Sequence, residues 1–281
     1  MDFQIGSART STEHPMLGDY PMHIHNDSHE IFCFRSGDAG YSVEGNRYQL
    51  EHGDLMLMRK GEVHHLIVKS DARYERSVIN FDLPPELDPD GRLLAPFNNR
   101  SLGKYNHYRA AQFPDNHWLF YLEKIEATED PRRKLCFLMP LLSDLADSFE
   151  LLKHTDPLSE KDRAAGVIKY INRHLGDDLS LELLAGQFYL SKTHLNRIFK
   201  QSTGTTVWEY IVVKRLFMAR ELLTAGQSPT QVFPQCGFQD YTTFYRAYKQ
   251  HFGISPKNEN GRSKAITVRK LEQQELSLIH I

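Results

Sequence analysis

The chain carries one helical pattern twice near its C-terminus. The first copy spans residues 179–204 and the second spans residues 230–253. In each copy a short apolar segment is followed by a break and then by a longer segment, which starts at Ser191 or at Asp240. Ser and Asp cap helix N-termini, and the longer segments place their apolar residues three and four positions apart. Each copy therefore predicts a short helix, a tight turn and a second helix.

The polar residues of each longer segment fall opposite its apolar residues. Arg and Asn side chains hydrogen-bond to purine edges in the major groove of DNA. Two such units in tandem therefore predict a DNA-binding protein, although a solvated helix face would explain the same polar residues. The residues on these outer faces are Thr193, His194, Asn196, Arg197, Tyr241, Thr242, Tyr245 and Arg246.

Residues 206–224, between the two copies, contain no Gly or Pro. We expect one helix with an inner stripe that includes Trp208, Ile211 and Leu216, spanning roughly 28 Å at about 1.5 Å per residue. Such a rod can hold two helices near the roughly 34 Å spacing of successive major grooves. The alternative is an ordinary amphipathic core helix.

One residue of the second copy conflicts with this pattern. Pro234 falls inside the predicted first helix, where proline removes a hydrogen bond and clashes with the preceding turn at a cost of about 3 kcal/mol. We therefore expect this second helix-turn-helix copy to be kinked or weakly docked, and to contribute less to DNA sequence specificity than the first copy.

The N-terminal half has the pattern of a β-protein. In residues 17–82, glycines separate short runs of β-branched, aromatic and aliphatic residues, and Glu44-Gly45-Asn46 marks a hairpin. Alternate positions at Phe32, Phe34, Met56 and Met58 indicate a sandwich core more than a ligand site. We expect a β-sandwich or barrel here.

Bulk properties limit the class of protein. The net charge is −2, but acidic residues predominate in residues 1–159 and basic residues predominate in residues 160–258, which suits a polyanion partner for the C-terminal half. No apolar stretch is long enough for a membrane span, and no signal-peptide core follows the N-terminus, so we expect a cytoplasmic protein without a membrane partner. Three distant cysteines argue against a disulfide framework.

The two halves together resemble a known family. His23-Ile24-His25, Glu30, Gly37, the run from Gly53 and the run Gly61 to His64 resemble a cupin, and the C-terminal half resembles the double helix-turn-helix of the AraC/XylS family of bacterial transcription regulators. This implies a two-domain α+β protein: a cupin-like β-sandwich or barrel in residues 1–155, which binds an effector and dimerises, an all-α tandem helix-turn-helix in residues 156–258, and a tail of unknown role in residues 259–281.

The resemblance also implies sites. Residues matched to DNA-contacting positions are Thr193, Asn196, Arg197, Lys200, Tyr241, Thr242, Thr243 and Arg246, of which Lys200 is expected to contact phosphate. Residues matched to the effector site are His23, His25, Glu30 and His64, with His23 and His25 on one face of a strand and Glu30 and His64 on neighbouring strands. In cupin enzymes such a set binds a divalent metal, so two interpretations remain: a polar lining for an organic effector, which we favour with no metal and no cofactor, or a metal site.

A leucine stripe at residues 135–152 has two interpretations, as core packed on the cupin or as a dimer seam, and it includes Pro140. We therefore expect a DNA-binding transcription regulator of the AraC type, not an enzyme, whose partners are promoter DNA, a small effector such as a carbohydrate, RNA polymerase if it activates, and a second copy of the chain. The alternatives are a metal-dependent cupin enzyme with an appended helical domain, and a helix-turn-helix protein whose cupin half only dimerises.

Overall fold

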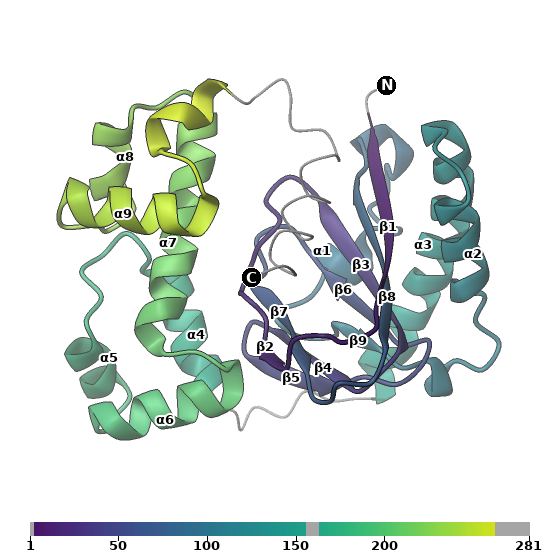
Figure 1. Cartoon of the computed structure of the whole chain (residues 1–281), viewed down its shortest axis with the longest axis horizontal. Coiled ribbons are helices and arrows are strands. Elements are labelled where there is room, and N and C mark those ends of the chain that lie inside the picture. The colour runs from purple at the N-terminus through teal and green to yellow at the C-terminus, as the bar shows by residue number, and fades with distance from the viewer. Residues whose placement is uncertain (1–2, 156–162, 262–281) are drawn as a thin grey trace. The chain divides into compact units, whose positions relative to one another are not determined.

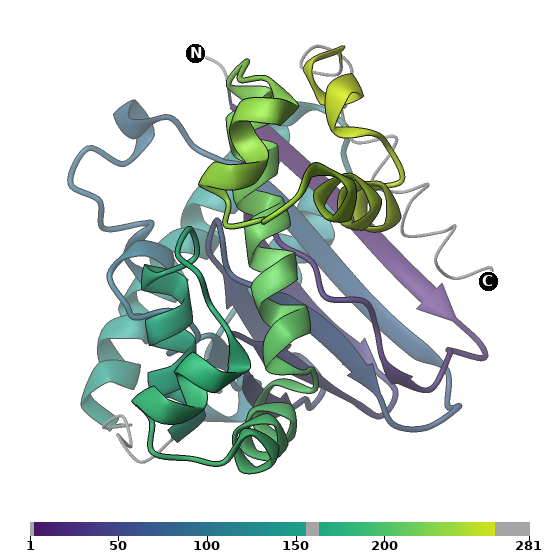
Figure 2. The ribbon, with the colours of Figure 1, turned by 90° about the vertical axis from the view of Figure 1, so that its left-hand side faces the viewer.

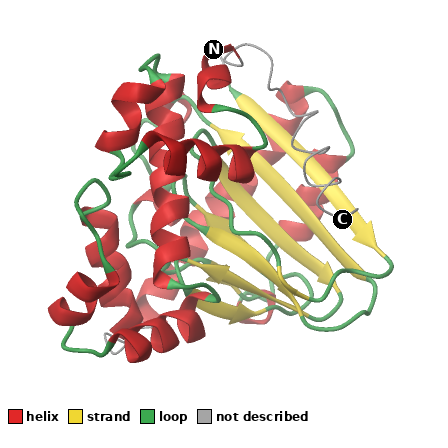
Figure 3. Cartoon of the chain, turned by 60° about the vertical axis from the view of Figure 1, so that its left-hand side comes forward, coloured by secondary structure: helices red, strands yellow, loops and turns green. Residues whose placement is uncertain are grey.

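The computed structural model describes residues 3–155 and 163–261, and the chain separates into two compact units with the division near residue 160 (Figure 1). The first unit holds all the described strands, and the second is helical (Figure 3). The predicted fold class, a cupin-like β-domain followed by an all-α domain, is confirmed.

The N-terminal unit is built on two antiparallel sheets. The five-stranded sheet has the order β1-β8-β3-β6-β9, and the four-stranded sheet has the order β2-β7-β4-β5. The strands are β1 (Gln4–Thr12), β2 (Gly18–Asp19), β3 (His29–Ser36), β4 (Ala39–Val43), β5 (Asn46–Gln49), β6 (Leu55–Met58), β7 (His64–Val68), β8 (Tyr74–Asp82) and β9 (His107–Tyr108). Strand β1 precedes the region in which strands were predicted, because its mostly polar sequence at a sheet edge lacks an apolar pattern.

The predicted hairpin at Glu44-Gly45 is confirmed. Val43 pairs with Asn46 across a two-residue turn in which Glu44 and Gly45 have φ of 46° and 85°. Two positive φ angles match the right-handed twist of the flanking strands. Glu44 is a costly residue for this conformation, and its carboxylate accepts a hydrogen bond of 2.8 Å from the backbone N–H of Val63, which holds it in place.

The five-stranded sheet is buried on both faces. On strand β3, Phe32 and Phe34 belong to the core between the two sheets, while Ile31 and Cys33 belong to a second core under the helices. Alternation of side chains along a strand produces this division. Met56 and Met58 lie in the core between the sheets with Phe32 and Phe34, which confirms the prediction that these four are sandwich core.

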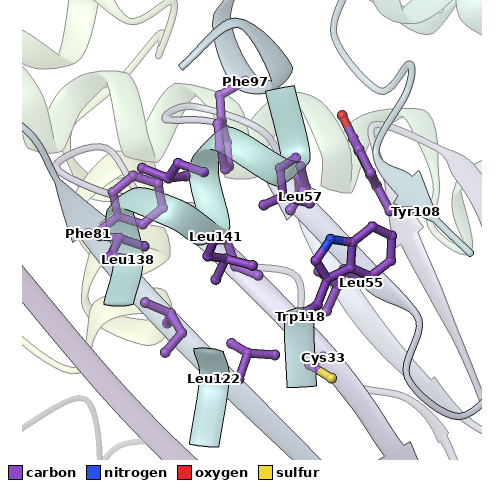
Figure 4. Packing of buried hydrophobic residues seen from close by; sticks show 14 of the residues in the cluster. Cys33, Leu55, Leu57, Phe81, Phe97, Tyr108, Trp118, Leu122, Leu138 and Leu141 are labelled. Atoms are coloured by element: carbon purple, nitrogen blue, oxygen red, sulfur yellow. The ribbon is translucent and has the colours of Figure 1, made fainter. Parts of the chain in front are cut away.

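The second core lies under two helices, α2 (Trp118–Glu126) and α3 (Pro131–Thr155), which run side by side near β1 (Figure 1). Trp118, Leu122, Leu138 and Leu141 pack there against Leu55 and Phe81 of the sheet (Figure 4). The leucine stripe of α3 is therefore core of its own domain, and this face is not available as a dimer seam. Helix α3 continues through Pro140, which the sequence marked as a helix breaker.

Shorter elements join the sheets to these helices: η1 (Pro85–Leu87), α1 (Ala95–Asn98) and η2 (Ala110–Gln112). Arg100, from the connection between α1 and β9, is buried and pairs with the fully buried Glu62 at 2.6 Å. Glu62 also accepts hydrogen bonds from the backbone of Gly103 and from the Asn106 amide, so the buried charges have hydrogen-bond partners.

The C-terminal unit contains two helix-turn-helix pairs joined by one long helix, α7 (Figure 2). The elements are α4 (Arg163–Arg173), α5 (Leu181–Gln187), α6 (Lys192–Thr203), α7 (Val207–Thr224), α8 (Pro229–Gln235), α9 (Tyr241–Phe252) and η3 (Pro256–Gly261). The predicted single helix between the two copies is confirmed, and Thr206 and Glu209 form a capping box at its start.

The helical unit extends beyond the boundary expected at residue 258. Glu259 is buried, and its carboxylate accepts a hydrogen bond of 2.8 Å from the Tyr248 hydroxyl and pairs with Arg220 at 2.9 Å. Element η3 is therefore part of the packed unit. The rest of the predicted tail lies outside the described residues.

No helix in the described part of the chain is long and apolar enough to cross a membrane. Cys33, Cys136 and Cys236 are free thiols, in agreement with the absence of a predicted disulfide framework.

The stability of the N-terminal unit should fall at acidic pH, in part through His29. This side chain is 4% exposed between Phe81 and Phe97, and burial lowers its pKa to about 4. A base with a lowered pKa in the folded state contributes stability that is present above its unfolded pKa of about 6.5 and is lost as pH falls toward 4, which amounts to about 2 kcal/mol between about pH 8 and about pH 5. Replacing His29→Phe should remove this share of the pH dependence in denaturant unfolding. Replacing the exposed His14→Gln should leave the dependence unchanged, and an unaltered slope in His29→Phe would contradict the assignment.

Candidate recognition helices and histidine cluster

Helix α6 is fixed by its buried face and both ends. Leu195 and Phe199 are fully buried, the Ser191 hydroxyl accepts from the backbone N–H of His194, and Gly204 ends the helix at φ 80°. The predicted cap and glycine stop are confirmed. The opposite face exposes Thr193, Arg197 and Lys200 to solvent.

Asn196 is placed differently from its exposed neighbours. It is partly buried, and its Oδ1 accepts a hydrogen bond of 3.3 Å from the backbone N–H of Val207, the first residue of α7. Its carbonyl oxygen therefore ties α6 to the start of the long helix. Only the amide nitrogen retains its full hydrogen-bonding capacity toward DNA.

Helix α9 repeats this construction. Phe244 and Tyr248 are fully buried, the Asp240 carboxylate accepts from the backbone N–H of Thr243 at 2.8 Å, and Gly253 ends the helix at φ 69°. Tyr241, Thr242, Thr243 and Arg246 are exposed. The Tyr241 ring packs against Tyr245 at 6.1 Å and against Phe233 at 5.8 Å, so this surface is more aromatic than that of α6.

The kink expected at Pro234 is not observed. Helix α8 has seven residues, as does α5, and Pro234 is its next-to-last residue. The proline ring therefore removes at most one bond of the final turn, and the N–H of Cys236 still bonds to Val232 O at 3.1 Å. Val232 and Cys236 are fully buried, so the second unit is docked.

Arg215 of helix α7 connects the two helix-turn-helix pairs. The sequence did not show this role. The Arg215 guanidinium is buried and donates hydrogen bonds to three backbone carbonyls: to Leu175 at 2.9 Å, to Asp177 at 2.7 Å and to Gly237 at 2.8 Å. Leu175 and Asp177 lie between α4 and α5, whereas Gly237 lies in the turn between α8 and α9. One side chain thus links both helix pairs to the helix between them.

Two glycines allow this contact. A Cβ at Gly237 would lie 2.6 Å from the Arg215 guanidinium, and one at Gly176 would lie 3.0 Å from Gln235 O. Gly237 also has φ 76°, a conformation that other residues adopt at a cost. Trp208, by contrast, was expected on the inner stripe of α7 and is 54% exposed, because it lies in the first turn of the helix, on the side away from the packed residues.

In the N-terminal unit the structure brings His23, His25, Glu30 and His64 together. One ligand atom of each lies within 4.8 Å of the others. His25 Nε2 lies 2.7 Å from Glu30 Oε2, and the rings of His23 and His64 are 4.2 Å apart between centroids. The Tyr41 hydroxyl donates to Glu30 Oε1 at 3.3 Å.

These residues come from different elements than predicted. His23 and His25 lie outside the strands, and an isolated bridge from His23 to His64 joins this segment to β7. Glu30 lies on β3 of the five-stranded sheet, while His64 lies on β7 of the other sheet. Facing sheets, and not neighbouring strands, therefore close the cluster.

The surroundings of the cluster favour neutral imidazoles at His23 and His64 and an ionised carboxylate at Glu30. Burial lowers the pKa of His64, and burial together with the nearby His64 and His25 lowers the pKa of His23 well below its usual range. Burial alone would raise the pKa of Glu30, but the nearby His25 lowers it overall. Three imidazoles and one carboxylate form a donor set that suits a divalent transition metal, so these four residues could hold one.

Comparisons with known proteins agree with both halves. Residues 7–86 match the family model of the AraC-like ligand binding domain, and residues 184–260 match that of a helix-turn-helix domain. The chain belongs to the AraC family of transcription regulators. The regulator thus combines a ligand-binding domain with a helix-turn-helix DNA-binding domain.

The curated relatives of the regulator include the HTH-type transcriptional activator RhaS of Escherichia coli K12, 27% identical over 280 residues, which cover 91% of this chain and 93% of RhaS. Among solved structures, ToxT from Vibrio cholerae O395 is 14% identical, with 94% of this chain and 99% of ToxT covered and a TM-score of 0.40. An AraC-type regulator from Chromobacterium violaceum is 29% identical over 36% of this chain and 91% of that chain, with a TM-score of 0.33.

Loss of the Arg215 side chain should destabilise the helical unit of the regulator. In Arg215→Gln, three backbone carbonyls lose a charged donor in a buried site, and we expect a loss of about 3 kcal/mol in the free energy of unfolding. Denaturant unfolding of the full chain measures this, with the exposed Arg173→Gln as a matched control. A loss below about 0.5 kcal/mol, the range of ordinary surface substitutions, would show that Arg215 does not hold the two helix-turn-helix pairs together.

Proposed function

We propose that the regulator binds promoter DNA with α6 and α9 in successive major grooves and responds to a small effector held at the histidine cluster. The observation that carries the DNA half of this proposal is the repeated recognition helix: two capped helices with exposed arginines, fixed to one continuous helix. An 18-residue α7 spans roughly 27 Å at about 1.5 Å per residue, which is compatible with two grooves on one face of DNA.

Arg197 and Arg246 are the proposed principal readers of base sequence. Both are exposed on the outer faces of their helices, and neither forms an ion pair with any described residue. A guanidinium that is not engaged within the protein can donate two hydrogen bonds to guanine. Thr193, Asn196, Tyr241, Thr242 and Thr243 are the proposed flanking contacts, with Asn196 acting through its amide nitrogen.

Lys200 is proposed as a phosphate contact. It lies in the last turn of α6, exposed, one position after the buried Phe199. A flexible ammonium group at the edge of a recognition helix neutralises backbone charge and carries no sequence information by itself.

The histidine cluster is the proposed effector site, and the proposed effector is a sugar or a sugar acid. A hydroxyl-rich molecule needs fixed polar groups within an otherwise apolar domain, and His23, His25, Glu30 and His64 supply them between the two sheets. The effector can act only if it binds one arrangement of the regulator better than another.

A metal-dependent cupin enzyme is the second candidate function, and the convergence of the four side chains favours it. We propose that the site does not turn over its ligand, since a sensor that destroys its signal molecule loses the signal.

We further propose that the regulator is cytoplasmic and forms homodimers through a surface other than the buried stripe of α3. If it activates transcription, as the name of RhaS states for that relative, we propose that it contacts RNA polymerase.

Substitution of the two arginines tests the recognition helices. Arg197→Ala and Arg246→Ala should each weaken binding to the operator by roughly 1–3 kcal/mol and relax the choice of one base, because each removes a base-edge contact. Lys200→Ala should weaken binding to all sequences alike. Fluorescence anisotropy with the operator and with scrambled DNA, at several salt concentrations, measures both effects.

The exposed Glu221→Gln is a control on α7, away from the recognition faces, and should not change sequence preference. Unchanged operator affinity in both arginine variants would show that α6 and α9 do not enter the grooves. If substitutions in the operator weaken binding equally beneath α6 and beneath α9, the second helix-turn-helix pair contributes as much sequence specificity as the first. That result would agree with the packed state of α8 and α9.

The effector site is tested by ligand-induced stabilisation. A panel of sugars and sugar acids should include compounds that raise the melting temperature of the full chain, and His64→Ala should abolish that rise because it removes a polar contact from the cluster. The exposed His14→Gln should retain it. A rise that persists in His64→Ala would place the effector elsewhere.

A further inference from the structure

The two recognition helices differ at matching positions. The first residue is Lys192 in α6 and Tyr241 in α9, and the fifth residue is Asn196 in α6 and Tyr245 in α9. The first and fifth residues are four positions apart, so they are neighbours on the same side of a helix. This side is polar in α6 and aromatic in α9. The two helices therefore present different chemical groups to a DNA groove.

Helix α8, which lies beside α9, extends this aromatic side (Figure 1). Phe233 is the fifth residue of α8, where α5 has the small and buried Ala185. Phe233 is only partly buried, and its ring packs edge to face against Tyr241, with 5.8 Å between the ring centroids. The Tyr241 ring in turn lies 6.1 Å from that of Tyr245. The three rings form one continuous surface, which we call the aromatic strip.

The aromatic strip is both accessible and held in place. Tyr241 is 37% exposed, and its ring also packs against the fully buried Phe244, with 6.1 Å between centroids. Thr242, the next residue of α9, is exposed and adds a methyl group beside the rings. Tyrosine has few rotatable bonds, so a packed tyrosine offers a large contact area at a small cost in conformational entropy. The strip is therefore suited to contact a partner without rearrangement.

The major groove of DNA offers one feature that suits such a surface. Bases in a duplex are stacked, so a protein in the groove contacts their edges, which carry mostly hydrogen-bond donors and acceptors. The exception is the C5-methyl group of thymine, which threonine methyl groups and aromatic rings contact. Cytosine and both purines lack this methyl group. An apolar strip on a recognition helix therefore favours thymine over the other bases.

We propose that α9 binds a half-site in which thymines flank the base pair read by Arg246, and that the aromatic strip and Thr242 select these thymines through their C5-methyl groups. This inference rests on the proposed function of α9 as a recognition helix. Helix α6 presents Asn196 and Arg197 instead, so its half-site is read mainly through hydrogen bonds. The two half-sites of one operator therefore differ in chemistry, and the regulator binds this asymmetric site in one orientation.

Replacement of thymine by uracil tests the proposal, because uracil pairs as thymine does and lacks only the C5-methyl group. The probe is duplex DNA that the full chain selects from a random pool, partially substituted with uracil. After binding, the bound and free fractions are cleaved at uracil, which shows the positions where the methyl group matters. Uracil beneath α9 should weaken binding by about fourfold for each buried methyl group. Uracil beneath α6 should have a smaller effect.

Variants of the protein assign the sensitive thymines to α9. In Tyr245→Ala, and in Thr242→Ser, which keeps the hydroxyl and lacks the methyl group, uracil at these thymines should no longer weaken binding because the contact is already lost. Tyr245→Phe keeps the ring and should restore the effect of uracil. Loss of the effect in Tyr245→Phe, in a chain that circular dichroism shows to be folded, would assign the contact to the hydroxyl and overturn the proposal.

Phe120→Ala is the matched control, since it removes an exposed aromatic ring from α2 of the N-terminal unit and should leave the pattern of uracil effects unchanged. Specific binding of the selected DNA without any uracil effect would overturn the thymine assignment and leave the DNA-binding function intact. Uracil effects that persist in both Tyr245→Ala and Thr242→Ser would do the same. Equal binding of all sequences, with none selected from the pool, would overturn the proposed function together with this inference.

Discussion

The geometry of the DNA-binding half depends on one buried guanidinium. Arg215 carries a charge in a site that burial makes unfavourable, which lowers its pKa, and three backbone carbonyls compensate for the lost hydration. Those carbonyls belong to the segment before α5 and to the turn before α9. The relative placement of α6 and α9 is therefore held by contacts whose loss would leave a buried charge unpaired. The proposed binding of both helices to successive major grooves requires such a constraint.

The N-terminal half meets a different constraint, a sheet with two apolar faces. Ile31 and Cys33 face α2 and α3, while Phe32 and Phe34 face the second sheet, so the domain has three layers. Because α3 covers the outer face of the five-stranded sheet, its leucine stripe is buried within the domain. The polar cluster at His64 is then placed at one end of the core between the sheets, where facing strands can contribute to it without breaking either apolar face.

Local signals in the sequence predicted much of this fold, and long-range contacts account for what they missed. Capping residues such as Ser191 and Asp240, and the turn at Gly45, act within a few positions, and each was found correctly. Strand β1 and the buried Glu259 depend on partners far along the chain, β8 and Arg220, and no local pattern marks them. Arg215 belongs to the same class. Its position on α7 was visible, but its three acceptors come from turns that only the fold brings together.

The histidine cluster shows how a correct set of residues can follow from an incorrect local picture. His23 and His25 were assigned to a strand, yet they lie on an irregular segment joined to β7 by one bridge. The alternation of side chains along a strand therefore does not orient the His23 and His25 rings. Hydrogen bonds to backbone carbonyls orient the rings of His23 and His64 and so help to bring the cluster together. Because that segment has few ladder bonds of its own, a ligand that joins it to β3 and β7 would add cross-links between both sheets. The coupling of ligand occupancy to the conformation of this segment then follows from the same contacts that form the site.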